Sequence, residues 1–82
     1  MSAEERLKCI EVRYFASLRD QRGVARETVA TRAETPLEAF VEADLGMPAS
    51  LVRFAVNGEF VSPESPLRDG DELCFIPPVA GG

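Results

Sequence analysis

The chain has 82 residues, of which 45% are apolar, and a formal net charge of −5 with no histidine. A chain of this length forms one small domain that buries about 60% of its unfolded surface, and its apolar share argues against a disordered protein. The acidic balance disfavours nucleic acid, whose binding depends on Lys and Arg, and no apolar run approaches the roughly 20 residues that span a membrane.

The first predicted element is a strand over residues 8–15, where apolar and polar side chains alternate. Ile10, Val12 and Tyr14 share one face and are expected to enter the core. Phe15 falls on the outer face or at the end of the strand.

Two short elements follow. Residues 16–21 are compatible with a helical turn that Gly23 ends. Residues 26–30 are predicted to form a second strand, because Thr28 and Val29 are β-branched.

The strongest local signal marks the start of a helix at Thr35. The Thr35 hydroxyl is expected to accept a hydrogen bond from the N–H of Glu38. The Glu38 carboxylate is expected to accept one from the N–H of Thr35, which completes a capping box. Pro36 suits the first helical position, where its missing N–H costs nothing.

The predicted helix carries one apolar stripe. We expect this stripe to contain Leu37, Phe40, Val41 and Leu45, and Gly46 to take the left-handed C-terminal position. A helix of about ten residues is marginal alone, so it must pack on a sheet.

Three further strands are predicted in the second half of the chain. Residues 52–56 form one, and Asn57-Gly58 predicts a type I′ hairpin turn, which needs φ > 0 at both positions. Residues 59–61 return as a short strand. Leu67 anchors the irregular crossing that follows, and residues 72–76 form the last strand.

This order predicts an α+β domain with one main helix covering one face of the sheet. By strand parity the other face carries Phe15, Phe60, Cys74 and Ile76. A contiguous apolar group of that kind marks a partner surface, and the net negative charge favours a partner with a basic docking surface.

The residue types exclude several chemistries. Without histidine, the usual general base and the usual metal ligand are missing. Cys9 and Cys74 form no CxxC pair, so they are expected to be reduced packing thiols, and no metal site is predicted. The sequence shows no nucleotide-binding or catalytic-triad motif, so the chain is not expected to be an enzyme by itself.

The end of the sequence is its most informative segment: Phe75-Ile76-Pro77-Pro78-Val79-Ala80-Gly81-Gly82. The two prolines stiffen the exit from the last strand, and residues 77–82 reach on the order of 20 Å when extended. Gly81 keeps the backbone thin beside the Gly82 carboxylate, which can then enter a narrow active-site channel. A frayed end is the alternative. Residues 1–6 are expected to be flexible.

Over nearly all of residues 10–82 the chain resembles the small, sulfur-carrying subunits of molybdopterin synthase, within the ubiquitin-like family of molybdopterin and thiamine sulfur carriers. The ending is the most specific match, because Gly-Gly alone marks many ubiquitin-like proteins. The segment 44–51 is short for the family. The other matching segments are Val12-Arg13-Tyr14-Phe15-Ala16 followed by Leu18-Arg19, Ala55-Val56-Asn57-Gly58, and Pro66-Leu67-Arg68-Asp69-Gly70-Asp71-Glu72.

The resemblance implies a single β-grasp domain over residues 1–82, with a mixed sheet of four to five strands, one main helix and a flexible Gly-Gly tail. It implies that an adenylating, ubiquitin-activating-like enzyme joins the Gly82 carboxylate to AMP from ATP. A sulfur donor then makes a thiocarboxylate, and the large synthase subunit takes the sulfur for the pterin precursor.

The resemblance also assigns partner contacts and a setting. Phe15, Phe60 and Ile76 match docking positions of the family, and the tail residues that enter the partner are Pro77, Pro78, Val79 and Ala80. No cofactor is expected to bind stably. A heterotetramer of two small and two large subunits is implied. The cytoplasmic location is expected from the residues themselves, because the polar and acidic residues 1–6 are unlike a secretory signal.

Three alternatives remain open on the sequence. The first is a sister carrier for thiamine, tRNA thiolation or cysteine synthesis. The second is a protein modifier that joins Gly82 to a lysine of a target. The third is a binding module without tail chemistry, for which loss of Gly81 and Gly82 leaves function intact.

Overall fold

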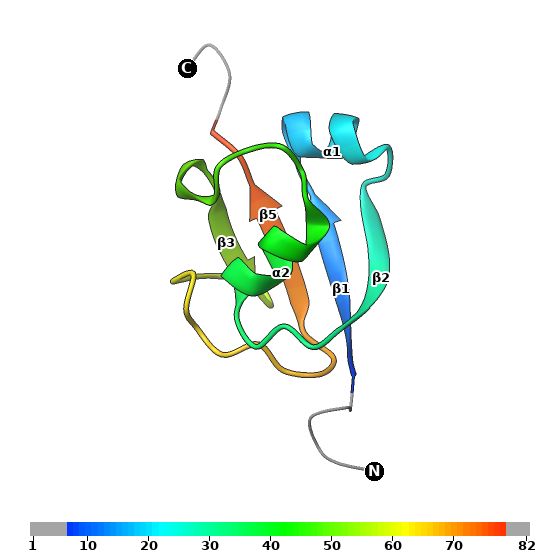
Figure 1. Cartoon of the computed structure of the whole chain (residues 1–82), viewed down its shortest axis with the longest axis vertical. Helices are drawn as coiled ribbons and strands as arrows, with labels where there is room; N and C mark the ends of the chain where they lie inside the picture. The colour runs from blue at the N-terminus through cyan, green and yellow to red at the C-terminus, as the bar shows by residue number, and fades with distance from the viewer. Residues whose placement is uncertain (1–6, 79–82) are drawn as a thin grey trace.

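The computed structural model describes residues 7–78 as a five-stranded sheet with two α-helices (Figure 1). In chain order the elements are β1 (Lys8–Tyr14), α1 (Ala16–Arg22), β2 (Arg26–Thr31), α2 (Pro36–Ala43), the short 3-10 helix η2 (Ala49–Leu51), β3 (Arg53–Val56), β4 (Glu59–Val61) and β5 (Glu72–Ile76). The predicted α+β order is confirmed, and all five strands lie in one sheet. No helix within the described residues is long and apolar enough to cross a membrane.

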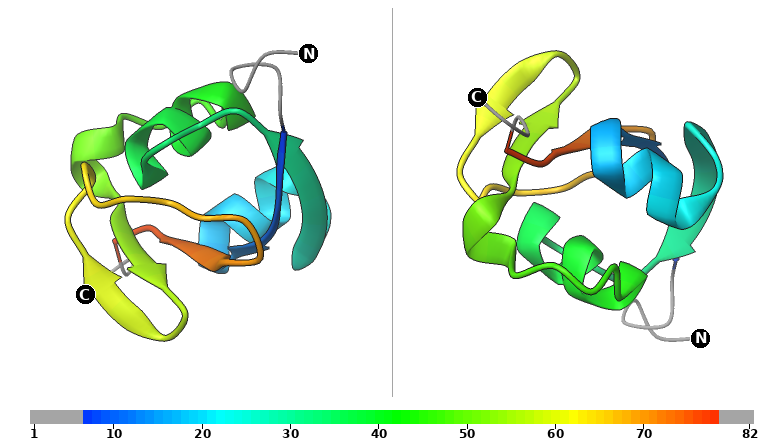
Figure 2. Two further views of the ribbon diagram at one scale, coloured as in Figure 1. Left: turned by 90° about the horizontal axis from the view of Figure 1, so that it is seen from below. Right: turned by 90° about the horizontal axis from the view of Figure 1, so that it is seen from above.

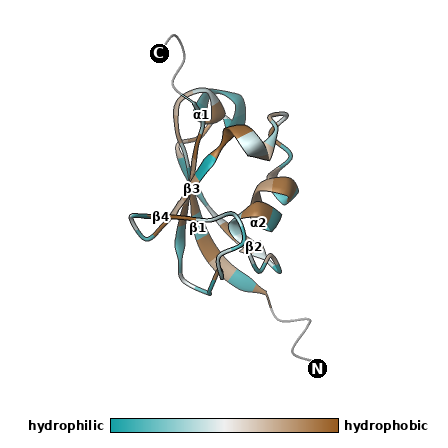
Figure 3. Ribbon diagram, turned by 90° about the vertical axis from the view of Figure 1, so that its left-hand side faces the viewer, coloured by the Kyte–Doolittle hydropathy of each residue, from teal (hydrophilic) through white to brown (hydrophobic). Residues whose placement is uncertain are grey.

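The strands lie in the order β2-β1-β5-β3-β4. β1 and β5 run parallel, and the other three neighbouring pairs are antiparallel. β5 therefore occupies the centre, while β2 and β4 form the two ends of the sheet (Figure 2). α2 packs on one face, and the β4 hairpin projects on the other side (Figure 3).

The core lies between the sheet and α2. The predicted parity of β1 is confirmed, because Ile10, Val12 and Tyr14 are buried. Phe75 of β5 lies at the centre of an aromatic cluster, with edge-on contacts to Tyr14, Phe40 and Phe54 at centroid distances of 5.9, 5.2 and 5.8 Å. Such contacts contribute about 0.5–1.5 kcal/mol each beyond the burial of their surface.

The two predicted turns form as expected. Asn57 and Gly58 have φ values of 53° and 88°, so both central residues of the β3–β4 hairpin are left-handed. Gly23 ends α1 with a φ of 86° and donates its N–H to the C=O of Arg19.

The capping prediction for α2 is half right. The Thr35 hydroxyl accepts from the Glu38 N–H at 3.1 Å. The Glu38 carboxylate, however, accepts from the N–H of Glu34 at 2.8 Å rather than from Thr35. The side chain reaches one residue further back, beyond the N-cap.

The predicted apolar stripe of α2 is wrong at Val41, which is 67% exposed. The buried stripe runs through Pro36, Ala39 and Phe40. Val41 follows Phe40 by one residue, about 100° around the helix, and so turns away from the sheet.

The end of α2 also differs from the prediction. The helix is eight residues long and ends at Ala43, with Asp44 as the left-handed C-cap at a φ of 52°. Gly46 is left-handed too, at 74°, but it lies beyond the cap in the following loop.

Candidate functional site

The described part of the tail, Pro77 and Pro78, leaves the domain from β5, the central strand of the sheet. β5 has a neighbour on each side, and both Leu73 and Phe75 are fully buried. After Ile76, Pro77 is buried and Pro78 is exposed, so the chain reaches the surface within two residues of the strand end. The predicted site residues Val79, Ala80, Gly81 and Gly82 lie outside the described residues.

The sheet face away from α2, called the outer face here, carries an exposed aromatic side chain. Phe60 of β4 is 61% exposed, and the Arg53 guanidinium lies over its ring at 4.3 Å from the centroid. Arg53 stands opposite Ile76 in the β3–β5 register. The outer face therefore brings Phe60, Arg53 and the residue that begins the tail onto neighbouring strands.

Phe15 extends this face across β5. It follows Tyr14, whose partner on β5 is Phe75, so the parallel register places Phe15 beside Ile76. Its backbone is extended, and the Arg13 guanidinium lies 5.2 Å from its ring centroid. The three predicted docking residues Phe15, Phe60 and Ile76 thus come from three strands or strand ends of one face.

Cys74 does not contribute exposed surface, contrary to the prediction. It lies on the outer face by parity, but only 6% of it is exposed. The register places it on the central strand between Arg13 and Ala55. Burial raises the pKa of the Cys74 thiol, and the charge of Glu72 raises it further. A nucleophilic thiolate needs the opposite shift, so the predicted packing role of Cys74 is confirmed. The same prediction is wrong for Cys9, which is exposed.

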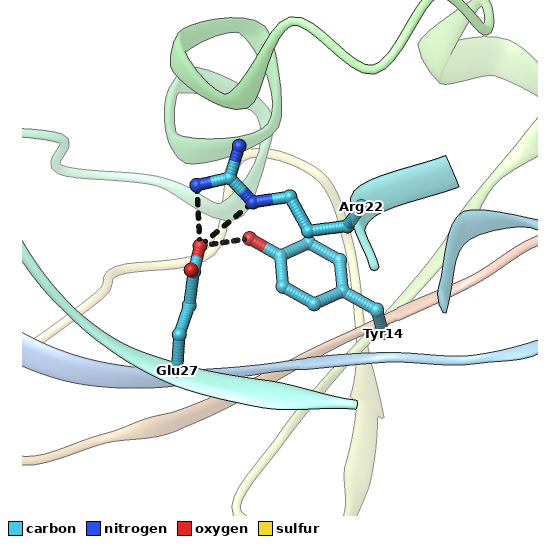
Figure 4. Close-up of polar contacts among 3 residues, drawn as sticks. All are labelled: Tyr14, Arg22 and Glu27. Carbon is cyan, nitrogen blue, oxygen red and sulfur yellow. Dashed lines mark hydrogen bonds and ion pairs between the residues drawn. The ribbon is translucent and has the colours of Figure 1, made fainter. Parts of the chain in front are cut away.

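A hydrogen-bond cluster on the opposite face, in which only Tyr14 is buried, was not predicted (Figure 4). The Tyr14 hydroxyl donates to Glu27 Oε2 at 2.8 Å. Arg22 donates to the same oxygen through Nε at 3.0 Å and through an Nη nitrogen at 2.7 Å. The cluster ties the end of α1 to β1 and β2. No spacing rule could reveal it, because each partner comes from a different element.

The electrostatics of this cluster follow from its geometry. Burial, followed by the Glu27 hydrogen bond and charge, raises the pKa of Tyr14 from 10.0 to about 12. Hydrogen bonds from Arg22 and then from Tyr14 lower the pKa of Glu27. Tyr14 therefore stays neutral and Glu27 charged near neutral pH, which suits a structural cluster rather than proton transfer.

The described residues show no other arrangement that suggests catalysis. No group of three or more His, Cys, Asp or Glu among residues 7–78 is placed to hold a metal ion. What the arrangement can do chemically is present a tail: a rigid central strand ends at the surface beside the aromatic outer face.

Sequence comparison finds close counterparts along nearly the whole chain. A family model described as the ThiS family matches residues 12–82. The molybdopterin synthase sulfur carrier subunit of Chlamydomonas reinhardtii is 35% identical over 81 residues, which cover 89% of this chain and 98% of that protein. The subunit of the same name from Escherichia coli is 37% identical over 81 residues, covering 89% and 99%.

Solved structures agree. A putative molybdopterin converting factor, subunit 1, from Pyrococcus furiosus superposes with a TM-score of 0.72 at 27% identity, covering 88% of this chain and 99% of that chain. A chain in the complex of subunits 1 and 2 of the Helicobacter pylori molybdopterin-converting factor gives 0.58 at 26%, covering 90% and 99%. A Caldiarchaeum subterraneum ubiquitin gives 0.58 at 16%, covering 93% and 99%, and shares the fold. The fold is ubiquitin-like β-grasp.

Proposed function

The chain belongs to the ThiS family, and on that premise we propose that it is the sulfur carrier of molybdopterin synthase, its small subunit. One observation carries the proposal: proteins of that name match it along 98–99% of their own length. The geometry supports it, because β5 delivers the terminal segment to the surface beside an apolar docking face.

The proposed chemistry takes place on the Gly82 carboxylate. An oxygen of this group attacks the α-phosphorus of ATP on an adenylating enzyme, and pyrophosphate leaves. Sulfur at the oxidation level of sulfide then attacks the acyl carbon, a C–S bond forms and AMP leaves. The product is a thiocarboxylate, a covalently tethered nucleophile whose effective concentration in a partner's site is high.

The thiocarboxylate delivers its sulfur in the large subunit. The sulfur displaces an oxygen substituent from a carbon of the pterin precursor, so that a C–S bond forms as a C–O bond breaks. Hydrolysis of the acyl–sulfur bond then restores the Gly82 carboxylate. Two such transfers supply both sulfurs of a dithiolene. The carrier contributes the reacting group, and the chemistry is completed on its partners, so it is not an enzyme by itself.

A large-subunit partner is supported by the complex of subunits 1 and 2 that contains a similar chain. We propose that Phe15, Phe60 and Ile76 form the contact, with Pro78 and the residues after it entering the partner. Pro77 is buried, so its part is to aim the tail. The adenylating enzyme, the cytoplasmic location and the heterotetramer remain predictions of the sequence.

Intact mass tests the tail chemistry. The full chain is incubated with ATP, an adenylating partner and a sulfide source. We expect the mass gain of one sulfur replacing one oxygen. A variant without Gly81 and Gly82 should show no gain and keep its melting temperature. Unchanged mass beside a demonstrably active partner would overturn the carrier function.

The same reaction separates the alternatives. Consumption of the thiocarboxylate by the large synthase subunit supports the proposal, whereas consumption only by thiamine, tRNA-thiolation or cysteine-forming enzymes would assign a sister carrier. Higher-mass bands that survive denaturation would indicate a protein modifier. Full function of the shortened variant would indicate a plain binding module.

A further inference from the structure

β2 is an open end of the sheet. Six register pairs join it to β1, from Lys8–Thr31 to Arg13–Arg26. Within residues 7–78 no segment pairs with its other edge, and both views of Figure 2 show β2 at the margin of the molecule. β4, at the opposite end, has only three residues. β2 is therefore the longer of the two open edges.

The backbone hydrogen bonds show which groups of β2 are free. Tyr14 donates its N–H to the C=O of Ala25 at 2.9 Å. Pairing alternates along an antiparallel ladder, so Glu27 and Val29 also face β1. The N–H and C=O of Thr28, and likewise those of Arg26 and Ala30, point outward.

The only charged residues of this edge are Arg26 and Glu27, and Glu27 is paired with Arg22. Natural edges are blunted by proline, lysine, bulges or shortness. β2 reads RETVAT, its register is unbroken over six pairs, and no residue in it has a positive φ. Thr28 and Ala30, which carry outward backbone groups, have small side chains and are exposed.

A cavity of about 180 Å³ lies beside this edge, between β1, β2 and α2. Its lining combines apolar side chains, among them Val29 and Phe75, with the charged side chains of Arg22, Glu27 and Glu42. Arg22 neutralises Glu27 at 2.7 Å. Glu42 accepts a hydrogen bond from the Thr31 hydroxyl at 2.5 Å, and no described cation forms an ion pair with it.

We propose that β2 binds an extended segment of a partner protein, which adds a sixth strand and places a Lys or Arg side chain in this cavity. Alternate side chains of an added strand lie on the same sheet face as Glu27, Val29 and Thr31, so they reach the cavity. A long basic side chain packs its methylene stem on the apolar lining and brings its charge to Glu42. Main-chain bonds provide affinity and the cavity provides specificity.

The site is separate from the proposed docking face. β2 and β4 are opposite ends of the sheet, and Phe60 lies on β4. A segment bound at β2 therefore leaves Phe60, Ile76 and the tail free. One partner can hold the carrier while another acts on Gly82, and the β2 site does not depend on the tail chemistry.

Amide hydrogen exchange of the full chain tests the proposal. The probe is a blocked peptide of alternating valine and threonine with a central lysine. At saturation we expect exchange at the Thr28 and Ala30 amides to slow by about tenfold or more, as for a newly formed hydrogen bond. The Val29 amide, which faces β1, should not change. The same peptide with N-methylated pairing amides should give no protection.

Two variants separate the backbone and charge contributions. Thr28→Pro removes an outward N–H that the β1 ladder does not use, a position where an edge strand accepts proline, and should abolish binding. Glu42 is exposed, so Glu42→Gln should weaken the lysine peptide by about twofold to fivefold but leave a norleucine peptide unchanged. If Thr28→Pro does not fold, the N-methylated peptide provides the same test.

Three results would overturn the proposal. The first is the absence of protection at Thr28 at millimolar peptide. The second is protection that rises with protein concentration alone, which would assign the edge to a second copy of the chain. The third is equal binding of the lysine and norleucine peptides, which would remove the role of the cavity.

Discussion

The Arg53 guanidinium lies 4.3 Å above the ring of Phe60, on the strand next to it. A cation over an aromatic face is held by the ring quadrupole, with about 0.5–1 kcal/mol at an exposed site. The pair fixes the orientation of a phenyl ring that is 61% exposed. A large aromatic side chain that is both exposed and oriented is typical of an interface hot spot.

Phe60→Ala should therefore weaken binding of the large synthase subunit by about tenfold or more. The free energy of unfolding should change little, because the ring is mostly exposed. Val41→Ala is the matched control, since Val41 is an exposed apolar residue on α2, at 67%. Calorimetric titration of both variants checks this, and equal losses of affinity would remove Phe60 from the interface.

Phe75→Ala removes the same side chain from the core. Unlike Phe60→Ala, it should strongly lower the free energy of unfolding. Removing a buried phenylalanine costs about 3–5 kcal/mol, and Phe75 has no exposed surface and contacts three other rings. A domain of this size has about 4–12 kcal/mol of total stability. Urea unfolding should show that only a small part of the free energy of unfolding remains. A loss below about 1 kcal/mol would contradict the packing described here.

Tyr14 should ionise with a pKa of about 12 instead of its ordinary 10.0. It is the only tyrosine and the chain has no tryptophan, so tyrosinate absorbance reports it directly. Glu27→Gln removes the neighbouring negative charge and should lower this pKa, while burial keeps part of the shift. Glu64→Gln, at an exposed residue, is the control and should not change the titration.

The same shifts predict how stability depends on pH. The raised pKa of Tyr14 stabilises the folded state below pH 10, and this contribution is lost as the pH rises from 10 to about 12. The lowered pKa of Glu27 acts in acid: its contribution is present above the unfolded pKa and is lost as the pH falls through the folded value. Tyr14→Phe should therefore reduce the fall in melting temperature above pH 10. The part of this fall that is due to other groups should remain.

Thr35→Ala should destabilise the domain by about 0.5–2 kcal/mol. The hydroxyl satisfies the Glu38 N–H at 3.1 Å, and alanine leaves that donor to solvent. Thr35→Ser keeps the acceptor and should restore most of the loss. Thermal unfolding of the two variants measures the difference, and equal melting temperatures would show that the cap contributes nothing.

Much of the fold was predictable because local patterns report local geometry. The alternation in residues 8–14 determines which side chains of β1 face the core, and the Asn57-Gly58 pair requires a left-handed hairpin turn. Parity also placed Phe15, Phe60 and Ile76 on one face. The Gly-Gly ending, which the sequence alone supplies, remains the basis of the proposed chemistry.

Tertiary structure determined the features that residue spacing could not predict. Parity puts Cys74 on the outer face, but its place on the central strand buries it. The helical pattern admits Val41 to the core, but α2 packs on the sheet through Pro36, Ala39 and Phe40, which leaves Val41 in solvent. The Tyr14–Glu27 bond and the cavity beside β2 depend on strand register and helix placement, because they join side chains from different elements. Local sequence determines which way a side chain points along its own element, and only packing determines what it meets there.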